Sequence, residues 1–276
     1  MELATQERKR SPLHSRRNGQ RRTRQRRRTD RWLLPLGLIL FVSVWSLVVY
    51  AGRYPTFILP SPTQVWQRFV AVMADGSLAR HTWITVREIL GGLTLGLTVA
   101  TALGYVLAKS RRVERFLSPY IVASQSVPVV ALAPLLIIWF GFGLLSKVLV
   151  CALTIFFPVL INTVVGIRSV DPALYELMRS LRATRWQTFR WLEVPAALPV
   201  LLGGLKIGVT LSVIGAVVGE FAQSDRGLGF LVNLANRGLF DTPLMFVALF
   251  VLTTIALGLY GIVSLMESIL LRWRQQ

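Results

Sequence analysis

The chain has 276 residues, of which 53% are hydrophobic and 16% are charged, and its formal net charge is +18. This composition excludes an ordinary soluble domain and indicates a protein that crosses a membrane several times. The single cysteine, Cys151, excludes a disulfide framework and a cysteine-based zinc site. The two histidines lie far apart in the sequence and do not suggest a metal site.

The N-terminal segment, residues 1–31, is rich in arginine and has no apolar periodicity, so we expect a basic, disordered tail. Basic flanks of this kind are typical of the cytoplasmic side of membrane proteins, where they contact anionic lipid. Binding of nucleic acid is the weaker alternative and is not expected. No small-residue cleavage site follows the tail, so we do not expect a signal peptide.

Apolar runs of about 20 residues can cross the hydrocarbon core of a bilayer as helices. Six such runs predict an all-α, polytopic membrane protein with six transmembrane helices. The runs are residues 32–51, 89–108, 120–140, 148–167, 198–219 and 242–266. The third is the membrane part of a longer apolar stretch, residues 116–146, that several prolines and glycines interrupt.

The distribution of Lys and Arg between the spans predicts the orientation. With the N-terminus in the cytoplasm, the cytoplasmic segments hold 23 basic residues and the opposite segments hold 7. The cytoplasmic segments are then residues 1–31, 109–118, 168–197 and 267–276. Both ends of the chain, including the last residues 273–276, are therefore expected on the cytoplasmic side.

Two local patterns precede the third span. Residues 61–64 have the form of a capping box, and the apolar residues between Trp66 and Met73 fall on one face, which predicts a short amphipathic helix on the outer surface. The second span carries small residues at every fourth position, which favours close packing of another helix, within one chain rather than between two. These small residues are Gly92, Gly96, Ala100, Gly104 and Ala108.

An Arg-rich segment of helical character, residues 171–195, separates the fourth and fifth spans. Asp171 can cap a helix with a buried stripe that begins at Leu174, and Thr184 can cap a second helix that Pro195 ends. The charged faces of the two helices are expected to carry Glu176, Arg179, Arg182, Arg185, Arg190 and Glu193. A charge at the bilayer centre costs about 2.5–3.5 kcal/mol, so this hairpin should lie in the cytoplasm. A loop that packs only on its own membrane ends is the alternative interpretation.

This segment resembles the EAA loop of the integral-membrane permeases of bacterial ABC importers. Glu176-Leu177-Met178 stands at the opening Glu-Ala-Ala, and residues 192–195 stand at the closing Ile-x-Leu-Pro. Arg182 occupies the position of the family glycine, which would cost about 1 kcal/mol if the turn needs a left-handed residue. The stretches "SQSVPVVALAPLLIIWFGFG" and "GEFAQSDRGLGFLVNLANRGLFDTPLMF" resemble the nitrate, sulfonate and taurine group of these permeases, and the similarity covers about residues 30–272.

The resemblance implies a type I ABC importer permease in the bacterial cell membrane, with residues 32–272 as the transmembrane domain. The implied partners are an ABC ATPase in two copies, a second permease copy in a homodimer and an extracytoplasmic substrate-binding protein. The chain has no G-x-x-x-x-G-K-[ST] loop, so we expect neither enzymatic activity nor a cofactor, and the partner hydrolyses ATP. The implied ATPase-coupling residues are Glu176, Leu177, Met178, Ser180, Arg182, Ala183 and Pro195.

Polar residues inside spans are candidates for a translocation path. These are Gln125, Ser126, Asn162 and Lys206. Lys206 is the one ionisable residue inside the predicted spans, and it can reach the cytoplasmic face by snorkelling. Contacts with the binding protein are expected from the opposite segments, with four candidates. These are Glu220, Asp225, Arg226 and Asp241.

The cargo is predicted from resemblance to the subset that carries riboflavin or the pyrimidine precursor of thiamine. Aromatic residues in the spans, such as Trp139 and Phe156, suit a flat neutral ring. Nitrate, sulfonate or taurine in the same permease role is the alternative. A stand-alone secondary transporter or a membrane-embedded enzyme is disfavoured, because the spans show no inverted repeat, no paired carboxylates and no histidine cluster.

Overall fold

The computed structural model describes residues 35–272, and every regular element in that range is a helix. The prediction of an all-α protein is therefore confirmed for the described residues. The chain divides into two compact bodies, one ending at Thr63 and one beginning at Gln64, and each is described by itself. The predicted tail, residues 1–31, and the predicted cytoplasmic end, residues 273–276, lie outside the described residues.

Five helices in the described range are long and apolar enough to cross a membrane. They are Pro35–Gly52, α3 (Ser77–Lys109), α6 (Leu144–Arg168), the continuous stretch Arg185–Ala222 and α11 (Thr242–Leu270). Each matches one predicted span. The last four extend beyond their predicted runs by several residues. Ionisable residues just outside the predicted runs therefore lie within these helices.

The remaining predicted span, residues 120–140, is not one helix. Helices α4 (Arg111–Gln125) and α5 (Val129–Phe140) meet at an angle of 94°, and together they supply a sixth span only if the bent pair counts as one. Pro128 stands at the break in an extended conformation, and a proline disfavours helical geometry in the residue before it. Pro119, in contrast, lies inside α4 without ending it.

In the first body, the helix Pro35–Gly52 buries none of its residues. Its end is followed by Arg53 with a positive φ of 46°. The indole Nε1 of Trp45 donates a hydrogen bond of 3.1 Å to the carbonyl of Pro60, which holds the segment after the helix against it.

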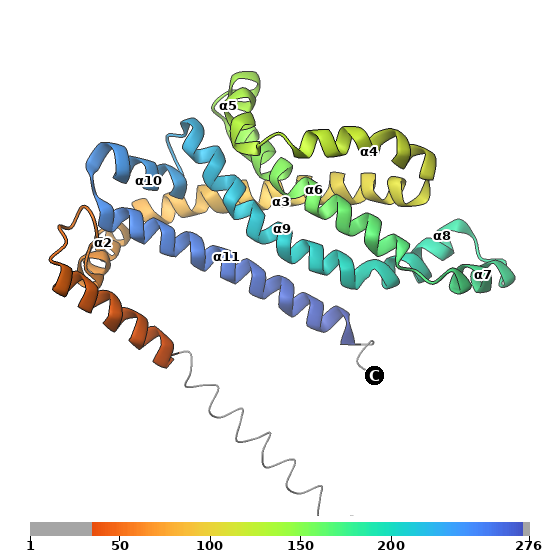
Figure 1. The fold of residues 1–276 in the computed structure, drawn as a ribbon, viewed down its shortest axis with the longest axis horizontal. Coiled ribbons are helices and arrows are strands. Elements are labelled where there is room, and N and C mark those ends of the chain that lie inside the picture. The colour runs from red at the N-terminus through yellow and green to blue at the C-terminus, as the bar shows by residue number, and fades with distance from the viewer. Residues whose placement is uncertain (1–34, 273–276) are drawn as a thin grey trace, which may run out of the picture. The chain divides into compact units, whose positions relative to one another are not determined.

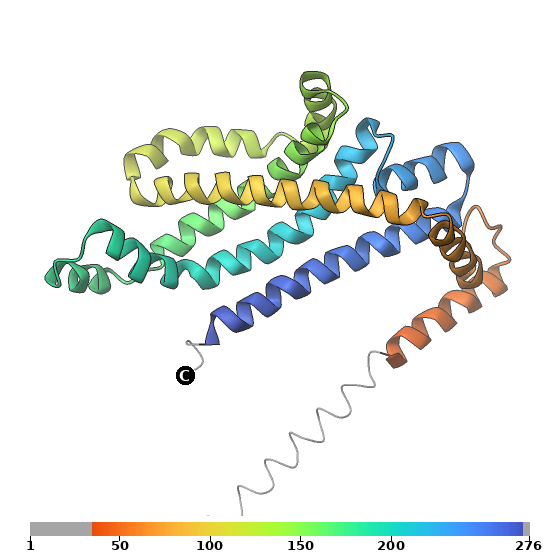
Figure 2. The same ribbon diagram turned by 180° about the vertical axis from the view of Figure 1, so that it is seen from behind.

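In the second body, α3 and α6 lie side by side along much of their length (Figures 1 and 2). The small residues of α3 make this approach possible. A Cβ atom added at Gly96 would lie 2.6 Å from the Ile155 side chain, and one added at Gly104 would lie 2.7 Å from Thr163. The prediction that this ridge packs within one chain is confirmed.

Helix α9 (Val194–Gln223) packs against the other side of α6, and α11 packs against α9. Gly215 again allows close contact, because a Cβ there would lie 2.8 Å from the Cα of Cys151. The centre of this layer is apolar, with Ile155 and Leu160 almost fully buried. Helices α3, α6 and α9 form the closely packed part of the second body.

Short helices gather at the two ends of these long helices (Figure 1). At one end lie α2 (Pro62–Ala74), α10 (Leu228–Leu234) and the π-helical turn η3 (Ala235–Leu239). The predicted short helix is confirmed as α2, but it buries Val65 and Val72, whereas Trp66 and Met73 of the predicted apolar face are exposed in the described chain.

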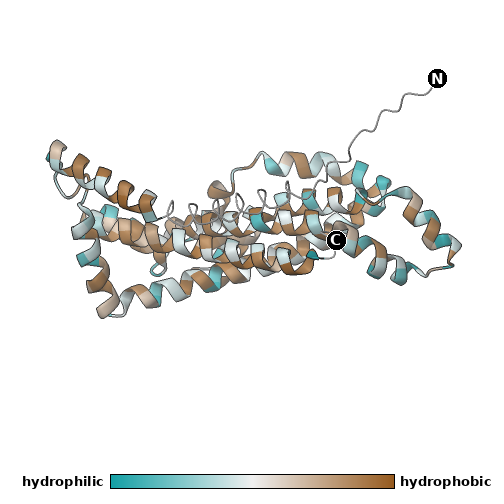
Figure 3. Ribbon diagram, turned by 90° about the horizontal axis from the view of Figure 1, so that it is seen from below, coloured by the Kyte–Doolittle hydropathy of each residue, from teal (hydrophilic) through white to brown (hydrophobic). Residues whose placement is uncertain are grey.

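At the other end, α7 (Pro172–Ser180), α8 (Arg185–Thr188) and the π-helical turn η2 (Phe189–Glu193) form the predicted hairpin. Figure 3 shows hydrophilic residues in the hairpin, whereas the long helices are mostly hydrophobic. Helix α3 has 33 residues, so it spans about 50 Å and reaches both ends.

Candidate functional site

Both predicted helix caps of the hairpin are confirmed. Asp171 precedes α7, and its Oδ1 accepts a 2.8 Å hydrogen bond from the backbone N–H of Ala173. Thr184 precedes α8 in a reciprocal capping box: its side chain accepts from the Gln187 N–H at 3.2 Å, and the Gln187 side chain accepts from the Thr184 N–H at 2.7 Å. The hairpin therefore begins and turns where the sequence predicts.

The turn between the two helices has left-handed geometry at Arg182, with a φ of 52°. The Arg182 N–H donates to the carbonyl of Arg179 at 2.9 Å, and the Ala183 N–H donates to the carbonyl of Met178 at 2.9 Å. These two bonds define a Schellman motif, which usually places glycine at the left-handed position. The turn therefore keeps its shape with arginine and carries a strain of about 1–2 kcal/mol.

The apolar stripe of α7 is not buried by the described chain, so the prediction of a buried stripe is wrong for one subunit alone. The exposed fraction is 53% for Leu177 and 68% for Leu181, and Trp186 at the start of α8 is 69% exposed. Glu176 and Ser180 are also exposed, and Met178 and Ala183 are half-buried. A contiguous exposed apolar surface of this kind is typical of a protein interaction site.

The hairpin is anchored to the end of α3 through Glu193, whose side chain is almost fully buried. The Tyr105 hydroxyl donates to Glu193 Oε2 at 3.0 Å, and the Lys109 ammonium forms an ion pair with Oε1. The same ammonium lies 5.0 Å from the ring centroid of Tyr175 on α7. Burial raises the pKa of the Tyr175 phenol, and the nearby Glu193 carboxylate adds to the effect.

Glu193 was predicted on the charged face of the hairpin, and Pro195 was predicted to end its second helix; both predictions are wrong. The π-helical turn η2 continues directly into α9, and the Val194 N–H donates to the carbonyl of Phe189, five residues back. A π-helical turn rotates the residues that follow it, and here Glu193 faces α3. Pro195 lies in the first turn of α9, where its missing N–H is tolerated.

A groove of about 600 Å³ lies between the hairpin and the ends of α3, α6 and α9. Its walls are mostly apolar. The lining includes Thr98, Tyr105, Thr163, Trp186, Phe189 and Leu201.

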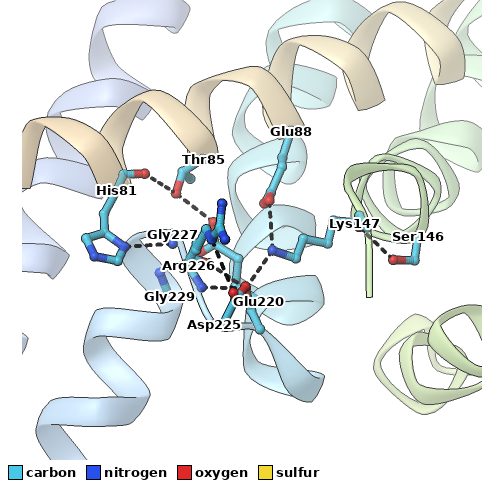
Figure 4. A network of polar contacts seen from close by, with 12 residues as sticks. His81, Thr85, Glu88, Ser146, Lys147, Glu220, Asp225, Arg226, Gly227 and Gly229 are labelled. Atoms are coloured by element: carbon cyan, nitrogen blue, oxygen red, sulfur yellow. Dashed lines mark hydrogen bonds and ion pairs between the residues drawn. The ribbon is translucent and has the colours of Figure 1, made fainter. Parts of the chain in front are cut away.

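At the opposite end of α3, three ionisable side chains are buried together (Figure 4). Glu88 on α3 is 1% exposed, Lys147 on α6 is 6% exposed and Glu220 on α9 is fully buried. The Lys147 ammonium lies 3.1 Å from Glu88 Oε1. Each of these three lies one residue beyond a predicted apolar run, so the search for ionisable residues inside the predicted spans, which found Lys206, did not include them.

Glu220 was also predicted to contact a binding protein from the surface, and its burial corrects that prediction. The Thr85 hydroxyl donates to Glu220 Oε1 at 2.6 Å, and the Gly229 N–H donates to Oε2. Gly227 has a φ of 110°, and a Cβ atom there would overlap the Glu220 carboxylate. The buried acid Glu220 thus requires both glycines of the "GLG" sequence. The "GLG" sequence was visible from the start, but nothing in its pattern pointed to a buried acid.

The loop at residues 224–229 is held by side chains of α3 and α6. His81 Nδ1 accepts from the Gly227 N–H at 2.9 Å, and the Thr85 hydroxyl accepts from the Leu228 N–H at 2.8 Å. The Lys147 ammonium donates to the Ser224 hydroxyl at 2.5 Å. The polar network therefore joins α3, α6, α9 and the start of α10 (Figure 4).

Of the other three candidates for a binding-protein contact, two lie in this loop and the third, Asp241, precedes α11. Asp225 and Arg226 form an exposed ion pair of 3.1 Å, with about 73% and 67% of their side chains accessible. Asp241 caps α11 through a 3.0 Å bond from the Leu244 N–H, and it pairs with Arg68 on α2 at 2.7 Å. A cavity of about 360 Å³ beside the network is lined by Arg87, Glu88, Phe142, Lys147, Asp225 and Arg226.

The structure does not bring the four predicted path residues together. Gln125 and Ser126 are exposed at the end of α4. Asn162 donates to the carbonyl of Pro158 at 2.8 Å, within its own helix. The Lys206 ammonium pairs with Glu267 on α11 and lies 5.6 Å from the Tyr260 ring centroid. The charge of Lys206 is thus balanced inside the described part of the chain.

Known proteins share this architecture and sequence. The chain is 51% identical over 240 residues to the riboflavin transport system permease protein RibX of Chloroflexus aurantiacus, covering 87% of this chain and 89% of that protein. It is 35% identical to the formylaminopyrimidine transport permease protein ThiX of Halalkalibacterium halodurans, covering 87% and 95%. A solved structure of the MetNI methionine ABC transporter, at 18% identity, superimposes with a TM-score of 0.63 over 70% of this chain and 95% of that chain.

The family predicted from the hairpin is confirmed. Residues 92–272, which include Lys147, Glu220 and the whole hairpin, match the model of one family. The chain belongs to the binding-protein-dependent transport system inner membrane component family.

Proposed function

We propose that this permease forms the translocation path of an ATP-driven importer for riboflavin or a closely related vitamin precursor. The observation that carries the cargo is the 51% identity to RibX, which extends over 87% of the chain. The similarity to ThiX favours the pyrimidine precursor of thiamine as the second candidate cargo. Residues 32–272 would form the transmembrane domain, with the N-terminus and the hairpin in the cytoplasm.

The hairpin is the proposed docking element for a partner ATPase. Its exposed stripe, which includes Leu177 on α7 and Leu181 directly after it, offers an apolar surface that cannot lie in hydrocarbon because Glu176 and Arg179 flank it. Two ATPases would move the hairpins of two permease copies in a homodimer. The proposed coupling residues remain Glu176, Leu177, Met178, Ser180, Arg182, Ala183 and Pro195.

On the other side of the membrane, the exposed pair Asp225–Arg226, and Asp241 at the start of α11, are the proposed contacts for an extracytoplasmic binding protein. The loop that carries the pair is supported from below by a buried polar network, so its position is well defined before any partner arrives. Gln125, Ser126, Asn162 and Lys206 remain proposed path residues. The 360 Å³ cavity beside the loop supports a polar entrance at this end.

Uptake of radiolabelled riboflavin tests this function in vesicles that contain the permease, its ATPase and its binding protein. ATP-dependent uptake, with competition by unlabelled riboflavin and none by nitrate or taurine, is the expected result. Glu176→Lys should abolish uptake by weakening the ATPase contact, whereas Asp75→Lys at the opposite end of the second body serves as the charge-matched control. Uptake of the pyrimidine precursor instead of riboflavin would favour the second cargo. If neither vitamin enters and the ATPase does not co-purify, the proposed function is wrong.

A further inference from the structure

Side chains of a helix to which the hairpin is not directly joined in sequence bind the hairpin. Its backbone continues into α6 on one side and α9 on the other. Its buried side-chain anchor, however, is on α3, where Tyr105 and Lys109 both bind Glu193. Tyr175, from the first arm of the hairpin, lies against the same Lys109 ammonium. Both arms of the hairpin therefore contact the last two turns of α3.

This contact resists separation because Glu193 is 2% exposed. A buried carboxylate without its partner loses hydration and gains nothing in return, so breaking such a pair is strongly unfavourable. The ring of Phe189 also packs edge-on against Tyr105, with centroids 5.3 Å apart. When the hairpin moves, the end of α3 is therefore expected to move with it.

Helix α3 is also a stiff element that reaches the far loop. Its glycines lie in close contact with α6 along the intervening turns. From Tyr105 the helix continues for about 26 Å to Glu88 at 1.5 Å per residue. There Thr85 and His81 bind the backbone N–H groups of residues 227–228. One helix thus holds the hairpin at one end and the loop with Asp225–Arg226 at the other.

We propose that α3 carries the movement of the hairpin to the loop at residues 224–229, and that Glu193 is the positioning residue through which this movement enters α3. The inference rests on the proposed function, because it takes the hairpin to be the ATPase contact and the loop to be the binding-protein contact. Since coupling between two sites is reciprocal, a loaded binding protein at the loop also changes the affinity of the hairpin for its ATPase partner.

A merely stabilising role for Glu193 makes a different prediction. Loss of stability lowers the number of folded complexes, which reduces uptake and ATP hydrolysis by the same factor. The number of riboflavin molecules imported per ATP hydrolysed is then unchanged. Loss of mechanical linkage lowers that ratio, because the ATPase turns over without moving α3. The ratio therefore separates the two roles.

The experiment compares Glu193→Gln and Lys109→Gln with a matched control, Glu114→Gln, in the complete complex in vesicles. Glu114 on α4 pairs at 2.6 Å with Arg168 at the end of α6, so this ion pair joins two helices outside the hairpin. Riboflavin uptake and ATP hydrolysis are measured in the same vesicles. The stimulation of hydrolysis by loaded binding protein is measured in parallel. The double variant Lys109→Glu with Glu193→Lys tests rescue by reversing the pair.

We expect the ratio of imported riboflavin to hydrolysed ATP to fall by at least about fivefold in both Gln variants, the lower limit usual for a coupling between two sites. Stimulation by the binding protein falls with it, the control stays near the wild-type ratio, and the reversed pair recovers part of the loss. An unchanged ratio in Glu193→Gln overturns the proposal. A wild-type complex without ATP-dependent uptake of either vitamin overturns the proposed function first, which keeps the two failures distinct.

Discussion

Replacing Arg182 by glycine is expected to stabilise the turn of the hairpin. Arg182 holds a φ of 52°, and a left-handed conformation costs an L-residue with a Cβ about 1–2 kcal/mol. Glycine avoids this cost but loses more conformational freedom on folding, by about 0.5–1 kcal/mol. The net gain is therefore about 0.5–1 kcal/mol. Arg182→Ala keeps the strain and is the matched control for loss of the arginine side chain.

Hydrogen exchange of the turn measures this gain locally. The N–H groups of Arg182 and Ala183 are protected by the two bonds of the Schellman motif, so their exchange reports opening of the turn. In Arg182→Gly, exchange of the Ala183 N–H should slow by about two- to fivefold relative to Arg182→Ala, in line with the difference of about 0.5–1 kcal/mol. Equal rates in the two variants, or faster exchange with glycine, would show that the turn is not strained.

Three further predictions follow from the buried network and the apolar stripe. Gly227→Ala should lower the free energy of unfolding by about 2–4 kcal/mol, because the new Cβ overlaps the Glu220 carboxylate at a positive φ; thermal unfolding in detergent measures it. Lys147→Met should cost about 3–5 kcal/mol by leaving the buried Glu88 without its cation; chemical denaturation measures it. Leu177→Asp should reduce co-purification of the ATPase by at least about tenfold, because losing a central apolar anchor of an interface typically costs about 1–2 kcal/mol or more of binding free energy. The permease itself should unfold at the same temperature.

Each of these predictions has a control within the same chain. Gly203→Ala on α9 meets open space and should leave the melting temperature unchanged. Lys206→Met removes a cation whose partner, Glu267, is about 29% exposed, so it should cost far less than Lys147→Met. Asp75→Lys, at the opposite end of the second body, should leave co-purification of the ATPase unchanged. Equal effects at the paired positions would contradict the roles assigned to burial and contact.

The sequence by itself determined the features that depend on residues close together in the chain. The run lengths of the apolar segments predicted where long helices lie, because a bilayer-spanning helix needs about 20 apolar residues whatever surrounds it. The caps at Asp171 and Thr184 act over three or four residues, and both are present. The "LRAT" turn was located for the same reason, and Arg182 was recognised there as the residue at a position that favours glycine.

Tertiary structure decided the features that depend on contacts between distant segments. Glu88, Lys147 and Glu220 each stand one residue beyond an apolar run, so hydropathy assigned them to loops. Only the packing of α3, α6 and α9 shows that their side chains meet in one buried cluster. The sequence also contains the glycine at position 227. The acid that requires it, Glu220, lies seven residues earlier on α9, and the chain must turn back before the two meet.

Contacts between distant segments also decided the orientation of Glu193 and the course of α4 and α5. Amphipathic spacing assumes 3.6 residues per turn, and the π-helical turn η2 breaks that period, so Glu193 faces Tyr105 and Lys109 rather than solvent. The prolines of residues 116–146 permit a bend at several places. The chain bends by 94° at Pro128, where α4 packs on α3 and α5 packs on α6. Sequence period and proline content limit the choices, and long-range packing selects among them, because side-chain burial is a property of two surfaces rather than one.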